Sequence, residues 1–299
     1  MGAAWSAELA GRVKKGGIMD VEDILVYVDG SPQSDVTLKL AAGVAQRFQA
    51  YLIGLHVIGL TLPTYDPATY LGGTHPSPLI GPIHDAAQHI ARECEDKFRG
   101  ELRQSGIKGE WHLDEGMVAD SVAREARYVD LAIVTQIDPA NPPLGTRRYV
   151  PQEVLLSSGR PVLVVPRDSR VDKMGEHILV GWNGSRESAR AVNDALPFLK
   201  AAKSVTVLAV TPQRMYEGEP SIVGDIVPHL ARHGVDAVTG ECARHPSGTS
   251  NTLLRYAADC GADMLVIGGY GHSRLRTLIL GGVSRGVLEC VTLPVLMSH

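Results

Sequence analysis

Short, continuously apolar runs alternate along this chain with longer segments in which apolar residues recur every three or four positions. Runs such as LAIV (131–134) and MLVI (264–267) are typical of strands that are covered by helices on both faces. Regular alternation of strand and helix predicts an α/β fold with a parallel, doubly wound sheet. The expected strands are 23–28, 51–57, 109–113, 130–135, 161–165, 177–182, 204–210, 236–241, 263–267 and 294–297. The expected helices are 33–48, 86–105, 118–127, 151–158, 186–201, 221–233, 248–260 and 283–291.

The order of expected strands and helices occurs twice along the chain. DILVYVDGSPQS, which begins at Asp23, is echoed by HILVGWNGSRES, which begins at His177. YVDLAIVTQ is likewise echoed by GADMLVIGG, and GRPVLVVP by TLPVLMSH. Because three segments recur in the same order, we expect two copies of one unit. The predicted domains are 21–166 and 177–299, joined by a polar linker.

Two further segments stand outside the repeat. Residues 1–20 lack the apolar core of a secretory signal, and we expect a dispensable extension, with a short docking helix as the alternative. The distance from Asp29 to Asn183 exceeds that from Asp130 to Asp263 by 154 − 133 = 21 positions. We expect most of this excess in a long Pro- and Gly-rich surface loop over Thr61–His84.

The segment GGYGHSRLRTLILGGVS (268–284) directly follows the expected strand 263–267. In an open parallel sheet, ligands bind beyond the carboxyl ends of the strands. Gly281 and Gly282 stand where the last helix begins, and the free N–H groups of a helix start favour an anion. Ser284 adds a hydroxyl. The alternative is a turn-rich connection without a ligand.

This segment resembles the signature of the universal stress protein family, in which Gly, two residues, Gly, nine residues and Gly precede a Ser or Thr. Gly268, Gly271 and Gly281 match that spacing, and GADMLVIG, PVLM and ILVYVDGS match the flanking strands. The resemblance covers nearly the whole chain from about residue 21, as a tandem pair. It implies two Rossmann-like domains, each with a five-stranded parallel sheet. It also implies that the strands in PVLVV and PVLM pair within the chain, which makes a pseudo-dimer.

The resemblance further implies an adenine nucleotide (ATP, ADP or AMP), with Mg²⁺ as an accompanying ion, in the second copy. The candidate contacts are Asn183, Val210, Ile267, Gly268, Gly271, His272, Gly281, Gly282, Val283 and Ser284. The chain departs from the family at two of these positions. Gly282 replaces a Ser or Thr but keeps its backbone amide, and Asn183 replaces an Asp and so loses charge-assisted hydrogen bonding.

The first copy departs more strongly. It keeps Asp29, but Thr135, Asp138 and Arg148 stand at the positions of the three spaced glycines. Three prolines also precede the next helix, and an acidic side chain would meet the phosphates. We therefore expect the first copy to be structural or a partner surface.

Other features narrow the function. The net charge of −4 and the dispersed Lys and Arg residues argue against nucleic acid as a partner, and no apolar run is long enough to span a membrane. The four scattered cysteines show neither zinc nor disulfide spacing, which favours the cytoplasm. His229 and His233 have the spacing of a ligand pair but no third ligand, so we expect an exposed helix face. Ser31 and Ser185 are expected to be helix caps.

These observations predict a cytosolic, nucleotide-binding regulator with an unknown protein partner. A homodimer of the whole chain is also expected. Two alternatives remain open: an interaction protein that binds no nucleotide, and a weak ATPase or phosphotransferase with His272 near the γ-phosphate. The Walker motif is absent from the sequence.

Overall fold

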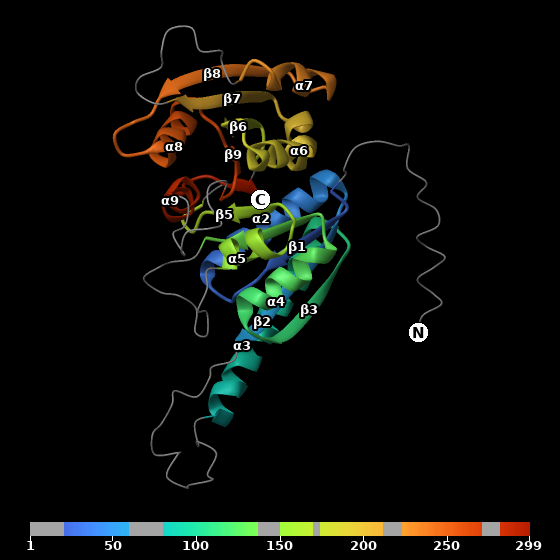
Figure 1. Cartoon of the computed structure of the whole chain (residues 1–299). Helices are drawn as coiled ribbons and strands as arrows, with labels where there is room; N and C mark the ends of the chain where they lie inside the picture. Colours follow the sequence, from blue (N-terminus) through green and yellow to red (C-terminus); the bar gives the residue numbers. More distant parts are fainter. Residues whose placement is uncertain (1–20, 60–79, 137–149, 170–173, 212–222, 271–281) are drawn as a thin grey trace, which may run out of the picture.

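The strands of the two copies form one continuous sheet. The computed structural model describes residues 21–59, 80–136, 150–169, 174–211, 223–270 and 282–299. Within these residues the sheet has ten strands in the order β3-β2-β1-β4-β5-β10-β9-β6-β7-β8 (Figure 1). The expected extension 1–20 and most of the expected loop 61–84 lie outside the described residues.

The first half of the chain supplies one edge of the sheet and the helices that cover it. Its strands are β1 (Asp23–Tyr27), β2 (Tyr51–Gly59), β3 (Gly109–Gly116), β4 (Leu131–Thr135) and β5 (Val162–Val165). Its helices are α2 (Pro32–Phe48), α3 (Ile80–Ser105), α4 (Val118–Glu125) and α5 (Val150–Ser157), with a short 3₁₀ turn over Ala126–Tyr128.

The second half repeats the same order. Its strands are β6 (His177–Trp182), β7 (Ser204–Thr211), β8 (Ala237–Ala243), β9 (Met264–Gly268) and β10 (Val295–Ser298). Its helices are α6 (Arg186–Ala201), α7 (Ile226–Arg232), α8 (Thr249–Asp259) and α9 (Gly282–Cys290). The predicted α/β fold with two doubly wound units is confirmed.

The two halves join at the centre of the sheet, where β10 pairs with β5. This pairing is antiparallel, with Leu296 opposite Leu163, whereas the other strand pairs are parallel. It confirms the pairing expected between the last strands of the two copies. Each half thereby covers the apolar strand edge of the other.

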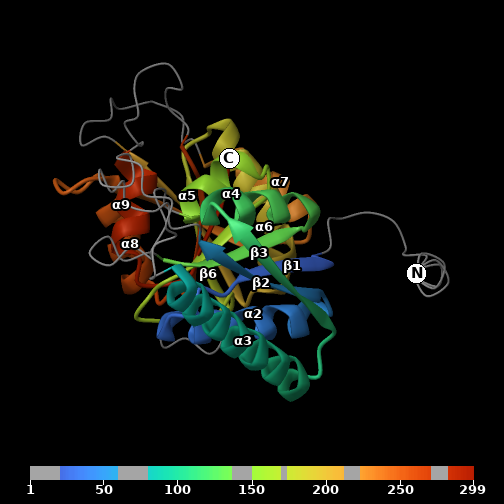
Figure 2. The same cartoon turned by 90° about the horizontal axis from the view of Figure 1, so that it is seen from below.

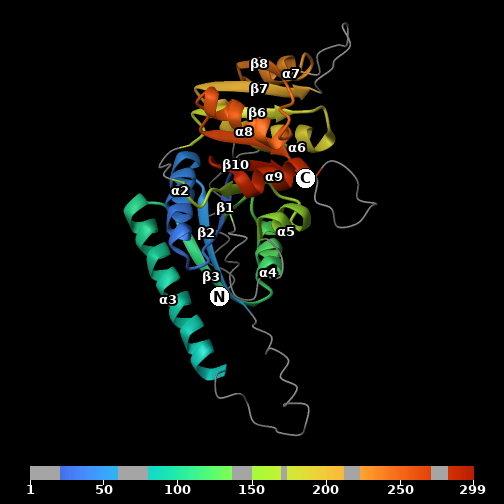
Figure 3. The ribbon, with the colours of Figure 1, turned by 90° about the vertical axis from the view of Figure 1, so that its left-hand side faces the viewer.

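Two apolar layers run across both halves. One lies between the sheet and α2, α3, α6 and α7, and the other between the sheet and α4, α5, α8 and α9. Figure 3 shows α2 and α3 on one side of the sheet and α4 and α5 on the other, and Figure 2 shows α3 and α4 on opposite sides from below. The strands are apolar on both faces because both faces are covered.

Polar contacts also cross between the halves. Arg47, near the end of α2, donates hydrogen bonds to the backbone carbonyls of Met174 (3.0 Å), Gly175 (3.2 Å) and Ala201 (2.8 Å). Gln136, just after β4, donates to the carbonyl of Leu288 at the last turn of α9 (2.7 Å). The two copies are therefore fixed to each other by side chains as well as by the sheet.

Two predicted helix starts were wrong, and in both helices a proline lies in the first turn. Helix α3 begins at Ile80, six residues before the expected start, so residues 80–84 of the expected loop are helical. Helix α7 begins at Ile226 rather than at 221. Pro82 and Pro228 thereby fall in the first turn of their helices, where the missing N–H has no partner to lose. No helix in the described part of the chain is long and apolar enough to cross a membrane.

Candidate functional site

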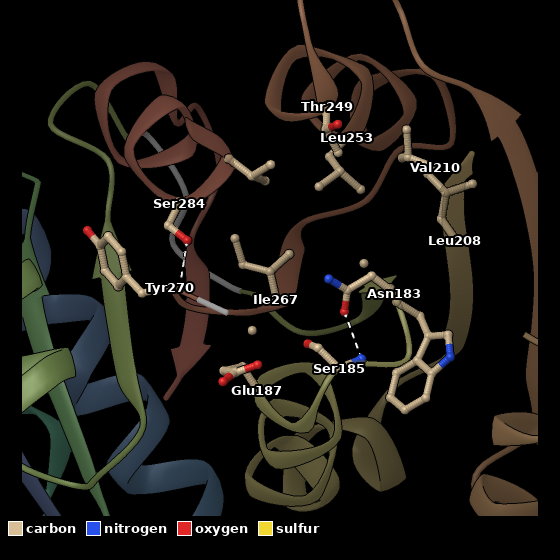
Figure 4. Close-up of a pocket in the computed structure, with 14 residues that line it drawn as sticks. Asn183, Ser185, Glu187, Leu208, Val210, Thr249, Leu253, Ile267, Tyr270 and Ser284 are labelled. Atoms are coloured by element: carbon tan, nitrogen blue, oxygen red, sulfur yellow. Dashed lines mark hydrogen bonds between the residues drawn. The ribbon is translucent and has the colours of Figure 1, made fainter. Parts of the chain in front are cut away.

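The carboxyl ends of β6, β7 and β9 surround a cleft in the second half (Figure 4). It contains about 820 Å³ of space free of protein atoms, including the part open to solvent. The described residues that line it are Gly181, Trp182, Asn183, Ser185, Glu187, Leu208, Val210, Thr249, Leu253, Ile267, Gly268, Tyr270, Val283 and Ser284. This is the edge of a parallel sheet at which ligands ordinarily bind.

One wall of the cleft is the turn between β6 and α6. Gly184 adopts φ +70° there, which favours glycine. The Ser185 hydroxyl accepts a hydrogen bond from the Ser188 amide and caps α6, as Ser31 caps α2, so both expected caps are confirmed. The carboxamide oxygen of Asn183 accepts from the Ser185 amide at 3.1 Å. Its NH₂ group consequently points into the cleft as a hydrogen-bond donor (Figure 4).

The opposite wall is formed by the end of β9 and the start of α9. The backbone amide of Tyr270 donates to the Ser284 hydroxyl at 3.0 Å. Tyr270 itself has φ +56°, an uncommon value for a residue with a side chain. Since the Ser284 oxygen acts as the acceptor, its hydroxyl hydrogen remains able to donate to a ligand. The cleft therefore offers a hydroxyl donor beside a helix start, which is a favourable environment for an anion.

Between these walls the cleft is apolar. Leu208 and Val210 come from β7, Ile267 from β9 and Leu253 from α8 (Figure 4). Apolar side chains with a few convergent polar groups are the usual lining of a small-molecule site. An aromatic ring could lie here with its polar atoms toward Asn183.

Glu187 is the single charged residue among the described lining residues. Its side chain is almost fully buried, at 3% exposure, and it forms an ion pair with Arg186. Burial raises the pKa of Glu187, but hydrogen bonds from Arg186, its own backbone amide and the Ser185 hydroxyl outweigh this effect and hold the pKa below its ordinary value. Glu187 is thus a carboxylate at neutral pH.

The half that carries the cleft is similar to a known protein family. The model of the universal stress protein family matches residues 174–299. This match covers the second copy of the repeat, which carries the cleft. Universal stress protein Slr1230 from Synechocystis sp. is 41% identical over 44 residues, which are 15% of this chain and 15% of that protein. The matched segment is thus a small part of either chain.

Two solved structures resemble the whole chain. A universal stress protein from Archaeoglobus fulgidus superposes with a TM-score of 0.69 and 18% identity, over 92% of this chain and 95% of that one. A protein of unknown function from Pseudomonas aeruginosa superposes with a TM-score of 0.54 and 18% identity, over 93% and 92% of the two chains. At this identity the likeness shows a shared two-copy fold.

The structure brings six of the ten predicted contact residues of the second half around the cleft. They are Asn183, Val210, Ile267, Gly268, Val283 and Ser284. Gly282 is the first residue of α9. Gly271, His272 and Gly281 lie outside the described residues.

Sequence reasoning did not single out Trp182, Glu187, Leu208, Thr249, Leu253 and Tyr270 as contacts. The period of the strands could have found Leu208, which lies two positions before Val210 and so faces the same side. Thr249 and Leu253 could have been inferred as the start of the helix after β8, because helix starts and carboxyl ends of strands share one edge of the sheet.

The first half lacks an equally open turn. A Cβ placed on Gly30 would lie 2.7 Å from Ile90 of α3, whereas a Cβ on Gly184 would meet nothing within 4 Å. Thr135, which corresponds to Gly268, makes a buried hydrogen bond to the hydroxyl of Thr37 at 2.7 Å. Asp138 and Arg148 lie outside the described residues.

No site for a metal formed by protein groups alone was found in the described ranges, where no three His, Cys, Asp or Glu side chains cluster. The rings of His229, in α7, and His233, which directly follows this helix, lie 4.7 Å apart, and both residues are partly exposed.

Proposed function

We propose that this protein binds one adenine nucleotide per chain, in the cleft of its second half, and acts as a regulator rather than as a committed enzyme. The observation that carries the proposal is the convergence of an apolar wall with Ser284 and the start of α9 in one cleft. An apolar wall suits a base, and a helix start suits a phosphate.

The proposed contacts follow from the polarity of each wall. Leu208, Val210 and Ile267 would pack against the adenine. The NH₂ group of Asn183 would donate to an oxygen of the ribose. Ser284 and the first amides of α9, including that of Gly282, would donate to phosphate. Gly271, His272 and Gly281 are proposed to complete the phosphate site.

Regulation would use helix α9, which both halves contact. Its first turn lines the cleft, and Gln136 of the first half holds the carbonyl of Leu288 in its last turn. A nucleotide that orders the start of α9 would thereby affect the position of residues from the first half. Hydrogen exchange at Gln136 and Leu288 with and without nucleotide tests this step, and unchanged exchange on saturation would contradict it.

We place the protein in the cytosol, in line with four cysteines that are all free. A further protein partner and a homodimer of the whole chain complete the proposal. Light scattering at several concentrations tests the dimer, and a constant monomer mass would overturn that part.

The direct experiment identifies what the protein carries. We would purify it natively, denature it, and identify released nucleotides by chromatography and mass spectrometry. The proposal expects about one adenine nucleotide per chain, or a rise in melting temperature when AMP, ADP or ATP is added to the empty protein. An empty protein that binds none of the three would overturn it and favour an interaction protein of the same fold.

A further inference from the structure

Gly181 is the second-to-last residue of β6, and it forms part of the wall of the cleft. Its φ is not positive, so the backbone conformation does not require a glycine at this position. A glycine inside a strand weakens the strand, because it has no side chain to pack. Such a glycine is typical of a place where a ligand or another backbone approaches closely. The feature that Gly181 provides is therefore space.

This space lies between two apolar side chains of the cleft. A Cβ on Gly181 would lie 2.9 Å from Cγ2 of Ile267 and 3.2 Å from Cδ2 of Leu253. Both contacts are with the ends of side chains that line the cleft, and Figure 4 shows these two side chains reaching toward one another. A side chain at position 181 would displace them and would itself occupy the apolar part of the cleft.

The first half carries a large side chain at the corresponding position, Tyr27. Tyr27 lies opposite Leu55 of β2, as Gly181 lies opposite Leu208 of β7. Tyr27 is 6% exposed, and it belongs to the apolar layer that contains Leu55 on the same side of the sheet as Leu208. The two halves thus differ most in size at a position that faces the cleft in the second half.

The phenol ring of Tyr27 lies near the turn that follows β1. Burial raises the pKa of Tyr27, and the negative charge of Asp29, the counterpart of Asn183, raises it further. The register of the strands also places Val134 at the position of Ile267. Valine lacks one methylene group of isoleucine, which leaves more room for the ring. Tyr27 therefore takes up space that stays open in the second half.

We infer that Gly181 admits the base of the nucleotide to the cleft, and that the side chain of Tyr27 takes the place of a base in the first half. This inference rests on the proposed function, and it names the position that determines which half binds. A planar base can pack against Leu208 and Ile267 only if no side chain extends between them from position 181. The difference between the halves thus arises in the first strand of each copy.

The test uses the full chain, with AMP and adenosine as ligands in calorimetric titrations. Adenosine has no phosphate, so it reports on the base and ribose part of the cleft. Gly181→Val should weaken the binding of both ligands by at least about tenfold, because its side chain fills the space for the base. Gly181→Ala should cause a smaller loss, because one methyl group displaces only the ends of Ile267 and Leu253.

Val180→Ile is the matched control. Val180 precedes Gly181 in the same strand, is 1% exposed, and lies in the opposite apolar layer. It is not among the described residues that line the cleft. Its extra methylene group strains the core without filling the cleft, so both affinities should stay unchanged. Circular dichroism and urea denaturation show whether each variant is folded.

Three results would overturn the inference while leaving nucleotide binding intact. The first is a folded Gly181→Val protein that binds AMP as tightly as the wild type; if this variant does not fold, unchanged AMP affinity in Gly181→Ala has the same meaning. The second is an equal loss of affinity in Gly181→Val and Val180→Ile, which would indicate general strain. The third is two adenosine molecules bound per wild-type chain, because Tyr27 would then leave room for a base. A wild type that binds neither ligand overturns the proposed function itself.

Discussion

The backbone amide of Tyr270 donates a hydrogen bond to the hydroxyl of Ser284, and this bond ties the end of β9 to the first turn of α9. Residues 271–283 lie between them in the sequence. Ser284 is 4% exposed, so its hydroxyl is held in place by packing as well as by this bond. One side chain therefore joins the end of β9 to the start of α9 and also lines the cleft.

Replacing Ser284 with alanine should weaken nucleotide binding and lower the stability of the protein. We expect nucleotide affinity to fall about five- to tenfold, because one hydrogen bond to the ligand contributes about 1 kcal/mol. The free energy of unfolding should fall by about 1–3 kcal/mol, since the Tyr270 amide loses its acceptor. Calorimetric titration and urea denaturation measure the two effects. Ser34→Ala, a buried serine of the first half, is the control and should leave affinity unchanged. Equal affinities in wild type and Ser284→Ala would remove Ser284 from the site.

Much of this architecture was predictable from local patterns. Apolar runs place the strands, and the repeated segments identify the two copies. The family resemblance implied that the strands in PVLVV and PVLM pair, and the structure pairs them with Leu163 opposite Leu296. The predicted contacts Asn183 and Ser284 do line one cleft, because both follow strands whose carboxyl ends share an edge of the sheet. Glu187 could not be predicted as a lining residue, because its burial depends on how closely α6 packs against Gly268. That packing is a tertiary property, which neither a motif nor a helical period contains.

Gly268 should be intolerant of any side chain. A Cβ there would lie 2.5 Å from the Ser188 amide nitrogen, which is backbone and cannot rotate away. We expect Gly268→Ala to lower the free energy of unfolding by about 1–3 kcal/mol through overpacking. Gly43→Ala is the matched control, because Gly43 is exposed within α2 and a Cβ there meets nothing within 4 Å. It should stabilise the protein by about 0.4–1 kcal/mol. Urea denaturation of both variants checks the prediction, and equal effects would contradict the close packing.

His56 should make the protein less stable in mild acid. It is 6% exposed, and its Nδ1 lies 2.7 Å from the carbonyl oxygen of Val28. Burial lowers the pKa of His56, against smaller opposing effects of Val28 and Asp29. The unfolded chain therefore takes up a proton first as the pH falls below about 6.5, and stability decreases from that pH downward.

His56→Phe should remove part of the loss of stability in acid. The part removed is up to about 1.4 kcal/mol in the free energy of unfolding for each unit by which the pKa of His56 differs between the folded and unfolded chain. Urea denaturation between about pH 5 and pH 8 measures it. His89→Asn is the control, because His89 is 67% exposed and pairs with Glu93 on the surface of α3. If His56→Phe and the wild type lose stability in parallel as the pH falls, another group is responsible.

The duplication provides a matched pair of variants that locates the binding site. Asn183 and Asp29 occupy equivalent turns, and each side-chain oxygen accepts from the amide two residues later, at 3.1 and 2.8 Å. Asn183→Ala and Asp29→Ala should therefore each cost about 1 kcal/mol of stability. Only Asn183→Ala should also weaken nucleotide binding, by about five- to tenfold, because the Asn183 NH₂ group faces the open cleft, whereas Ile90 of α3 lies close to Gly30 in the equivalent turn. Titration of both variants with AMP shows which half binds the nucleotide. A comparable loss of affinity in Asp29→Ala, or two nucleotides bound per wild-type chain, would mean that the first half binds nucleotide as well.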